Sequence, residues 1–247
     1  MNFRHAAYSA AFACLALMMA PPASAGEPRA IIELFTSQGC SSCPPADKLL
    51  GELARDPSLV TMSLAVDYWD YLGWKDTLAL RGHSNRARAY ANARGDREVY
   101  TPQVVVNGIA HVLGSDKDAI ERAVAHTRRT AIPLSLPVTL SIADNKVTAS
   151  VPTAKDGTRN GEVWLCPITS RVSIAIERGE NHGRSLTYYN VVRRWVKLGD
   201  WTGKAESFSV PLADVAANDI DSFVVVVQSG GADKPGLMLG AAVAAAR

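Results

Sequence analysis

The stretch RAIIELFTSQGCSSCPPAD spans residues 29–47 and contains, in order, an apolar segment, a pair of cysteines and a pair of prolines. Residues 29–35 are mostly apolar and include two isoleucines, a pattern that predicts a short buried strand. Cys40 and Cys43 follow with two residues between them, and two prolines then stand where the first turn of a helix tolerates them. Helical spacing of alanine and leucine continues to Ala54. The cysteine pair is therefore predicted at a strand-to-helix junction.

Two cysteines at such a junction suit thiol–disulfide exchange. The Cys40–Cys43 spacing allows a disulfide with little strain, and the unpaired N–H groups and dipole of the first helical turn favour a thiolate. We expect Cys40 to be the less enclosed sulfur and the nucleophile, and Cys43 to resolve the mixed disulfide. The alternatives are a permanent disulfide or half of a metal site. The sequence has no second CxxC pair, and its five histidines are scattered, so no metal site is predicted.

The N-terminus has the pattern of an export signal. Arg4 precedes an apolar run over residues 6–20, and Ala23-Ser24-Ala25 fits the small-residue cleavage rule. A signal peptide is predicted over residues 1–25, which places the mature protein in the periplasm or outside the cell. Its removal takes Cys14 away and leaves three cysteines. An odd number in an oxidising compartment means that one thiol stays free or pairs transiently.

The composition is that of a soluble globular protein. The 247 residues are 47% hydrophobic and 20% charged, with a formal net charge of +2. This near balance does not provide the basic surface that nucleic-acid binding needs. The arginine-rich stretch 81–97 also contains acidic residues and is interpreted as a solvated helix face. No apolar stretch after the signal is long enough for a membrane span.

Strand and helix patterns alternate through the rest of the first half. Asn107-Gly108 between two apolar runs predicts a β-hairpin. Ser115 is expected to cap the last helix, with Asp118 at its third position. The other expected elements are a strand at 59–66, an aromatic loop at 67–74, a helix at 76–94, strands at 103–107 and 109–113, and a helix at 119–129. The order β-α-β-α-β-β-α predicts one α/β domain over residues 28–131.

The pattern changes after a short linker between Pro133 and Pro137. Short alternating segments separated by turn residues predict an antiparallel β-sandwich-like domain over residues 134–247. The expected strands are 138–142, 146–151, 162–168, 173–176, 191–198, 206–210 and 223–228, and the tail at 237–246 is expected to be a last strand or an edge cover.

Five motifs cover most of the mature chain: ELFTSQGCSSCPPAD (33–47), DYWD (67–70), VYTPQVVVNG (99–108), ERGENHGR (177–184) and YNVVR (189–193). Together they resemble the exported bacterial family called domain of unknown function 1223. The resemblance implies a thioredoxin-like domain followed by a β-rich domain, and it implies no substrate.

Thioredoxin-like proteins place a cis-proline beside the CxxC pair. Thr101-Pro102 matches that position, so the resemblance implies a cis bond there, with Thr101 beside an extended substrate.

The remaining candidate residues lie outside the CxxC stretch. Trp69 and Trp74 follow the second strand, and loops after parallel strands gather at one sheet edge, so they are candidates for substrate binding; core packing is the alternative. Cys166 lies in a strand pattern and is expected to be a buried apolar residue rather than a redox relay. A loop with His182, Arg184 and Tyr188 could hold a polar site, but a hydrogen-bonded surface loop is the favoured interpretation.

These observations predict an exported thiol–disulfide oxidoreductase that acts on protein thiols and disulfides. The catalytic candidates are Cys40, Cys43 and Pro102, and no cofactor is expected besides the redox-active disulfide. The expected partners are exported substrate proteins or a redox protein, with no nucleic acid and no membrane span. The alternatives are an extracytoplasmic binding or scaffold protein with a structural disulfide, and a copper- or zinc-handling protein.

Overall fold

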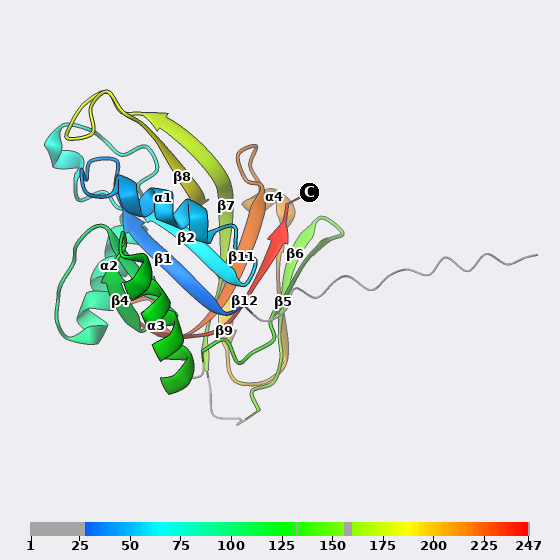
Figure 1. Ribbon diagram of the computed structural model, residues 1–247. Helices are drawn as coiled ribbons and strands as arrows, with labels where there is room; N and C mark the ends of the chain where they lie inside the picture. Colours follow the sequence, from blue (N-terminus) through cyan, green and yellow to red (C-terminus); the bar gives the residue numbers. More distant parts are fainter. Residues whose placement is uncertain (1–27, 132, 156–159, 247) are drawn as a thin grey trace, which may run out of the picture.

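The computed structural model describes residues 28–131, 133–155 and 160–246 (Figure 1). The predicted signal peptide at 1–25 lies outside these residues. The elements of the first half are β1 (Ala30–Thr36), α1 (Pro44–Leu53), β2 (Leu59–Ala65), the 3-10 turn η1 (Asp70–Leu72), α2 (Arg81–Arg94), β3 (Gln103–Val106), β4 (Ala110–Leu113) and α3 (Lys117–Thr130). Their order confirms the predicted β-α-β-α-β-β-α pattern.

The strands of the first half form the middle and one end of a large sheet. β1 pairs in parallel with β2 along its whole length, from Ala30 opposite Leu59 onward. On its other side β1 pairs antiparallel with β3, which forms a hairpin with β4. Asn107 and Gly108 join this hairpin with φ of 53° and 77°. These positive angles explain the Asn-Gly pair, because both turn residues must adopt the left-handed region.

Helices cover both faces of this part of the sheet. On one face, α1 and α3 bury their leucine, isoleucine and alanine side chains against β1 and β3 (Figure 1). On the other face, α2 places Ala87 and Tyr90 against the opposite side chains of β1, among them Ile31 and Phe35. Alternate β1 residues therefore enter different cores, which is why the strand is apolar almost throughout.

The second half continues the same sheet. Its elements are β5 (Thr139–Ala143), β6 (Lys146–Val151), β7 (Gly161–Ala175), β8 (Ser185–Val192), β9 (Val196–Trp201), β10 (Glu206–Pro211), the short helix α4 (Leu212–Val215), β11 (Ser222–Gly231) and β12 (Lys234–Ala245). β8 pairs in parallel with β2 at Ser63 and Val191, and β7, β11 and β12 extend the sheet in antiparallel pairs. Within the described residues this gives a mixed nine-stranded sheet.

The β-rich half thus differs from the separate antiparallel sandwich that the sequence predicted. Most of its strands belong to the mixed sheet that also holds β1 to β4. A small sheet of β5, β6 and β10 lies against the C-terminal part of the large one through a shared apolar cluster that includes Val147, Phe223 and Val225. Alternating strand patterns do not reveal which sheet a strand joins, so their assembly was predicted wrongly. The single strand predicted at 191–198 is also two strands, because β8 ends at Val192 and β9 begins at Val196.

Some element boundaries also differ. β7 is one continuous strand where the sequence predicted two, at 162–168 and 173–176. Asp116 rather than Ser115 caps α3, because its carboxylate accepts from the Ala119 N–H at 2.8 Å. α2 begins at Arg81 rather than Asp76.

Candidate functional site: a disulfide held between two loops

Cys40 and Cys43 form a disulfide at the start of α1, as predicted. Their Cα atoms are 5.4 Å apart. Cys43 is the N-cap residue of α1, and its carbonyl accepts from the N–H groups of Ala46 and Asp47. Pro44 occupies the first helical position, where no intrahelical N–H bond is lost. The strand-to-helix junction therefore holds the pair as the sequence implied.

Both sulfur-bearing residues are buried, whereas the two serines between them are exposed. Cys40 is 1% and Cys43 0% exposed. The expectation that Cys40 is the less enclosed residue is therefore not confirmed. The Ser42 hydroxyl lies 3.4 Å from the Cys40 sulfur. Exposure does not distinguish the two cysteines, so assigning the nucleophile rests on the position of Cys40 ahead of the helix.

The Thr101–Pro102 peptide bond is cis, as the resemblance implied. The indole N–H of Trp69 donates to the Thr101 hydroxyl at 2.8 Å. The Cβ of Trp69 also approaches Gly39 so closely that an added Cβ there would lie 3.0 Å away. Trp69 therefore connects the segment before Pro102 with the residue before Cys40. The direct contact of Pro102 with the sulfurs stays a prediction.

Gln38 connects the aromatic loop to the cysteine loop, which is the segment of residues 37–43 between β1 and α1. Its backbone N–H donates to the Asp76 carboxylate at 2.7 Å, and its side-chain oxygen accepts from the Trp74 indole at 2.8 Å. The Gln38 side-chain amide also donates to the Thr77 hydroxyl. Asp76 uses its other oxygen to accept from Leu78, and its burial raises its pKa. These contacts confirm that both loops share one sheet edge, while substrate binding by the tryptophans stays a prediction.

The loop between β7 and β8, residues 177–184, reaches across from the second half and holds the cysteine loop. The buried Asn181 amide donates to the carbonyls of Gln38 at 2.9 Å and Cys40 at 3.0 Å. The Glu180 carboxylate accepts from the Ser41 N–H at 3.1 Å, and the Ser41 bonds lower the Glu180 pKa. The sequence analysis missed these contacts, although the motif ERGENHGR covers this loop.

The predicted group of His182, Arg184 and Tyr188 does not form a polar site of its own. His182 is exposed, and Arg184 donates to the Asn181 side-chain oxygen at 2.8 Å. Tyr188 is buried in an apolar cluster. The favoured interpretation of a hydrogen-bonded surface loop therefore agrees with the contacts of Arg184.

A buried carboxyl group lies one helical turn after Cys43. Asp47 is 3% exposed, and within the described residues neither of its carboxyl oxygens has a hydrogen-bond partner. Burial raises the pKa of Asp47 to about 8, and the nearby Thr36 hydroxyl opposes that shift. A carboxyl group without a partner cation keeps its proton in such surroundings. Asp47 therefore provides a protonated acid on the inner side of α1, and the sequence analysis did not single it out.

Cys166 lies far along the chain in β7 and is fully buried, as predicted. Its side chain belongs to the cluster that α2 covers, and burial raises its pKa. A buried polar network lies in the same region. Arg86 donates to Glu33 at 2.6 Å and to Gln228 at 2.7 Å, and Tyr90 donates to Glu33 at 2.5 Å. The network links β1 and α2 to β11, so it joins the two halves.

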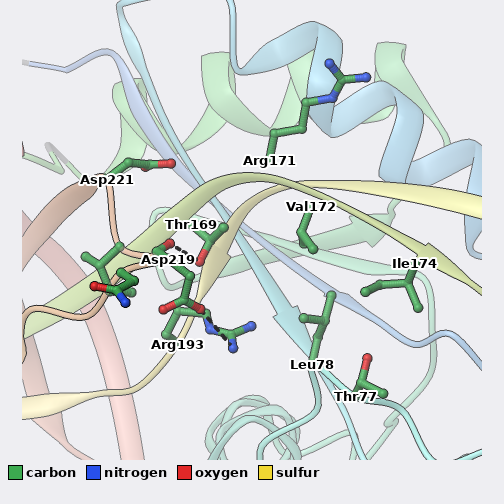
Figure 2. A pocket seen from close by; sticks show the side chains of 11 residues that line it. Thr77, Leu78, Thr169, Arg171, Val172, Ile174, Arg193, Asp219 and Asp221 are labelled. Atoms are coloured by element: carbon green, nitrogen blue, oxygen red, sulfur yellow. Dashed lines mark hydrogen bonds and ion pairs between the residues drawn. The ribbon is translucent and has the colours of Figure 1, made fainter.

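A pocket of about 720 Å³ lies between the loop after β2, strand β7 and residues 218–221 before β11, with Arg193 also in its lining. Figure 2 shows Arg193 and Asp219 directed toward one another inside it, and their charged groups are 3.2 Å apart. Thr77, which contacts Gln38, is among the lining residues, but neither cysteine is. The pocket thus adjoins the loops that hold the disulfide without containing the sulfurs.

Neither a metal-binding cluster nor a membrane-spanning helix occurs among the described residues. No group of three or more His, Cys, Asp or Glu residues in this part of the chain could hold a metal ion. None of the helices that the structure describes is long and apolar enough to cross a membrane.

A protein family and a solved structure are similar to this chain over most of its length. The sequence model of a family described as "Protein of unknown function (DUF1223)" matches residues 31–228. The crystal structure of protein AGR_C_4864 from Agrobacterium tumefaciens is similar over 88% of this chain and 94% of its own, with 30% sequence identity and a TM-score of 0.78. No curated protein matches the chain.

Proposed function

The chain belongs to the DUF1223 family, and we propose that it is an exported thiol–disulfide oxidoreductase acting on proteins through Cys40 and Cys43. The observation that carries the proposal is the disulfide at the N-terminus of α1. Helix N-termini stabilise a thiolate, which is the attacking species in exchange.

The architecture of the first half supports this proposal. The β2-β1-β3-β4 order, with β3 antiparallel to β1 and β4 antiparallel to β3, fits a thioredoxin-like arrangement. So does the placement of α1 and α3 on one face and α2 on the other. A cis-proline at Pro102 fits the same arrangement. In this proposal Thr101, Trp69 and Trp74 line the path of an extended substrate.

The proposed exchange balances with a protein disulfide as substrate. The Cys40 thiolate attacks one substrate sulfur, forms a mixed disulfide and releases the other substrate sulfur as a thiolate. The Cys43 thiolate then attacks the Cys40 sulfur, and the second substrate thiolate leaves. The pair ends as a disulfide, and a dithiol protein returns two electrons to it.

The reduction potential of the Cys40–Cys43 pair is the decisive test. We expect a value above about −300 mV in glutathione or dithiothreitol buffers, and catalysis of insulin reduction that Cys40→Ser abolishes. Cys166→Ala is the matched control and should keep the activity. A potential below about −300 mV together with no catalysis would instead identify a permanent structural disulfide.

A further inference from the structure

The loop between β7 and β8 is the only part of the described second half whose side chains hydrogen-bond the backbone of the cysteine loop. Residues 177–184 stand about 140 positions later in the chain than the cysteines. Nevertheless, a buried asparagine and an exposed glutamate of this loop bind three backbone groups of the cysteine loop. These groups are the Gln38 carbonyl, the Cys40 carbonyl and the Ser41 N–H.

Glu180 places a negative charge beside the amide that follows Cys40. Its carboxylate accepts from the Ser41 N–H at 3.1 Å. In the disulfide the Cys40 sulfur is uncharged, so the carboxylate does not repel it. After reduction the same sulfur carries charge as a thiolate, and a nearby carboxylate disfavours that form.

Asn181 fixes the position of this charge. Its amide is fully buried and donates to two carbonyls of the cysteine loop, and its oxygen accepts from Arg184. Gly179 packs against Trp74, because a Cβ added at Gly179 would lie 3.3 Å from the Trp74 Cβ. An exposed glutamate on an unanchored loop would spend most of its time in solvent, whereas Glu180 is anchored by its neighbours on both sides.

We infer that Glu180 is a positioning residue that stabilises the disulfide against the thiolate form and so lowers the reduction potential of the Cys40–Cys43 pair, with Asn181 holding it in place. The inference rests on the proposed function, because a tuned reduction potential has a biological role only if the Cys40–Cys43 pair exchanges disulfides. It assigns to the second half of the chain, through the β7–β8 loop, the role of setting that potential. The other charged or titratable groups around the cysteine loop include Asp47 on α1, Asp76 after β2, and Glu177, Arg178, His182 and Arg184 on the same loop as Glu180.

The test compares Glu180→Gln with wild type in dithiothreitol redox buffers. Glutamine keeps an oxygen that can accept from Ser41 and removes only the charge. We expect the equilibrium constant for disulfide formation to fall about threefold to tenfold, which corresponds to a potential higher by about 15 to 30 mV. The alkylation rate of the reduced protein near pH 6 should rise by a similar factor, because more Cys40 is present as thiolate.

Three further variants make the result specific. Glu180→Asp keeps the charge and should stay near the wild-type potential. Glu177→Gln removes the same charge from an exposed position of the same loop and should change the constant less than twofold. Asn181→Ala should shift the potential in the same direction as Glu180→Gln, and the double variant should add little, because both changes remove one interaction.

An unchanged potential and alkylation profile in Glu180→Gln would overturn the inference, as would an equal shift in Glu177→Gln. Failure of the inference is distinguishable from failure of the proposed function. The potential and the alkylation profile are measured on the protein alone, whereas the proposed function requires the wild-type protein to catalyse exchange on a protein substrate. Catalysis with no effect of Glu180 would leave the function intact and remove the role of the loop.

Discussion

Replacing Asp47 with asparagine should remove a pH dependence from the stability of the folded protein. The pKa of Asp47 is about 8 in the folded protein and 3.8 as an isolated group. Between these values the folded protein keeps the Asp47 proton and the unfolded chain has lost it. Since the folded state then binds more protons, its stability is greatest below the lower pKa and falls as the pH rises toward the higher one.

The size of this effect follows from the two pKa values. Each pH unit between them costs about 1.4 kcal/mol of unfolding free energy, and the slope halves at the folded-state pKa. From about pH 6.5 to about pH 8 the loss for wild type is therefore about 1.5 kcal/mol. Buried His83 offsets about 0.4 kcal/mol of this loss, because burial lowers its pKa to about 4, whereas the unfolded imidazole still binds about half a proton at pH 6.5 and releases it as the pH rises. Asp47→Asn should lose this decrease with pH, since asparagine fills the same space and does not titrate.

Urea unfolding followed by tryptophan fluorescence at several pH values measures the slope. A Cys166→Ala background prevents thiol exchange in the unfolded chain. Asp233→Asn, at an exposed turn position, is the control and should keep the wild-type slope. Equal slopes in wild type and Asp47→Asn would show that Asp47 is ionised in the folded protein, and would refute its assignment as a protonated acid behind Cys43.

Three other predictions concern different parts of the molecule. Cys166 should be slow to alkylate until the protein unfolds, and a rate like that of an exposed thiol would contradict its burial in β7. Reduction of the disulfide should change tryptophan fluorescence, and Trp69→Phe with Trp74→Phe should remove most of the change; a signal that persists would place those indoles outside the site. Glu33→Gln should destabilise the protein by about 3 to 5 kcal/mol in urea, because it removes the carboxylate that pairs with buried Arg86, and a loss below about 1 kcal/mol would contradict that pairing role.

The parts of the fold that depend on neighbouring residues were predictable from the sequence. The strand before Cys40, the prolines after Cys43 and the Asn107-Gly108 turn each follow from local backbone preferences. The cis bond before Pro102 came from the family resemblance instead. The cap of α3 was misplaced by one residue, because Ser115 and Asp116 both suit the position and only the structure distinguishes them.

The parts that depend on distant residues were not predictable. Asn181 and Glu180 contact the cysteine loop across about 140 residues, and nothing in their own stretch specifies a partner. Asp47 lies in a helical pattern that does not reveal whether its side chain points inward. The parallel pairing of β2 with β8 is likewise a long-range event. Single-sequence patterns identify elements, whereas the site is completed by contacts between them.

The parallel pairing of β2 with β8 also limits how this protein can be divided. If the chain were cut after residue 131, β2 would become an open edge with its hydrogen-bonding groups unpaired. The cluster that includes Met62 and Leu64 would lose its cover from Cys166, Val224 and Met238. An exposed apolar strand edge is a template for aggregation. We therefore expect the half that carries the cysteines to need a new partner strand along β2 if it is grafted onto or recombined with other proteins.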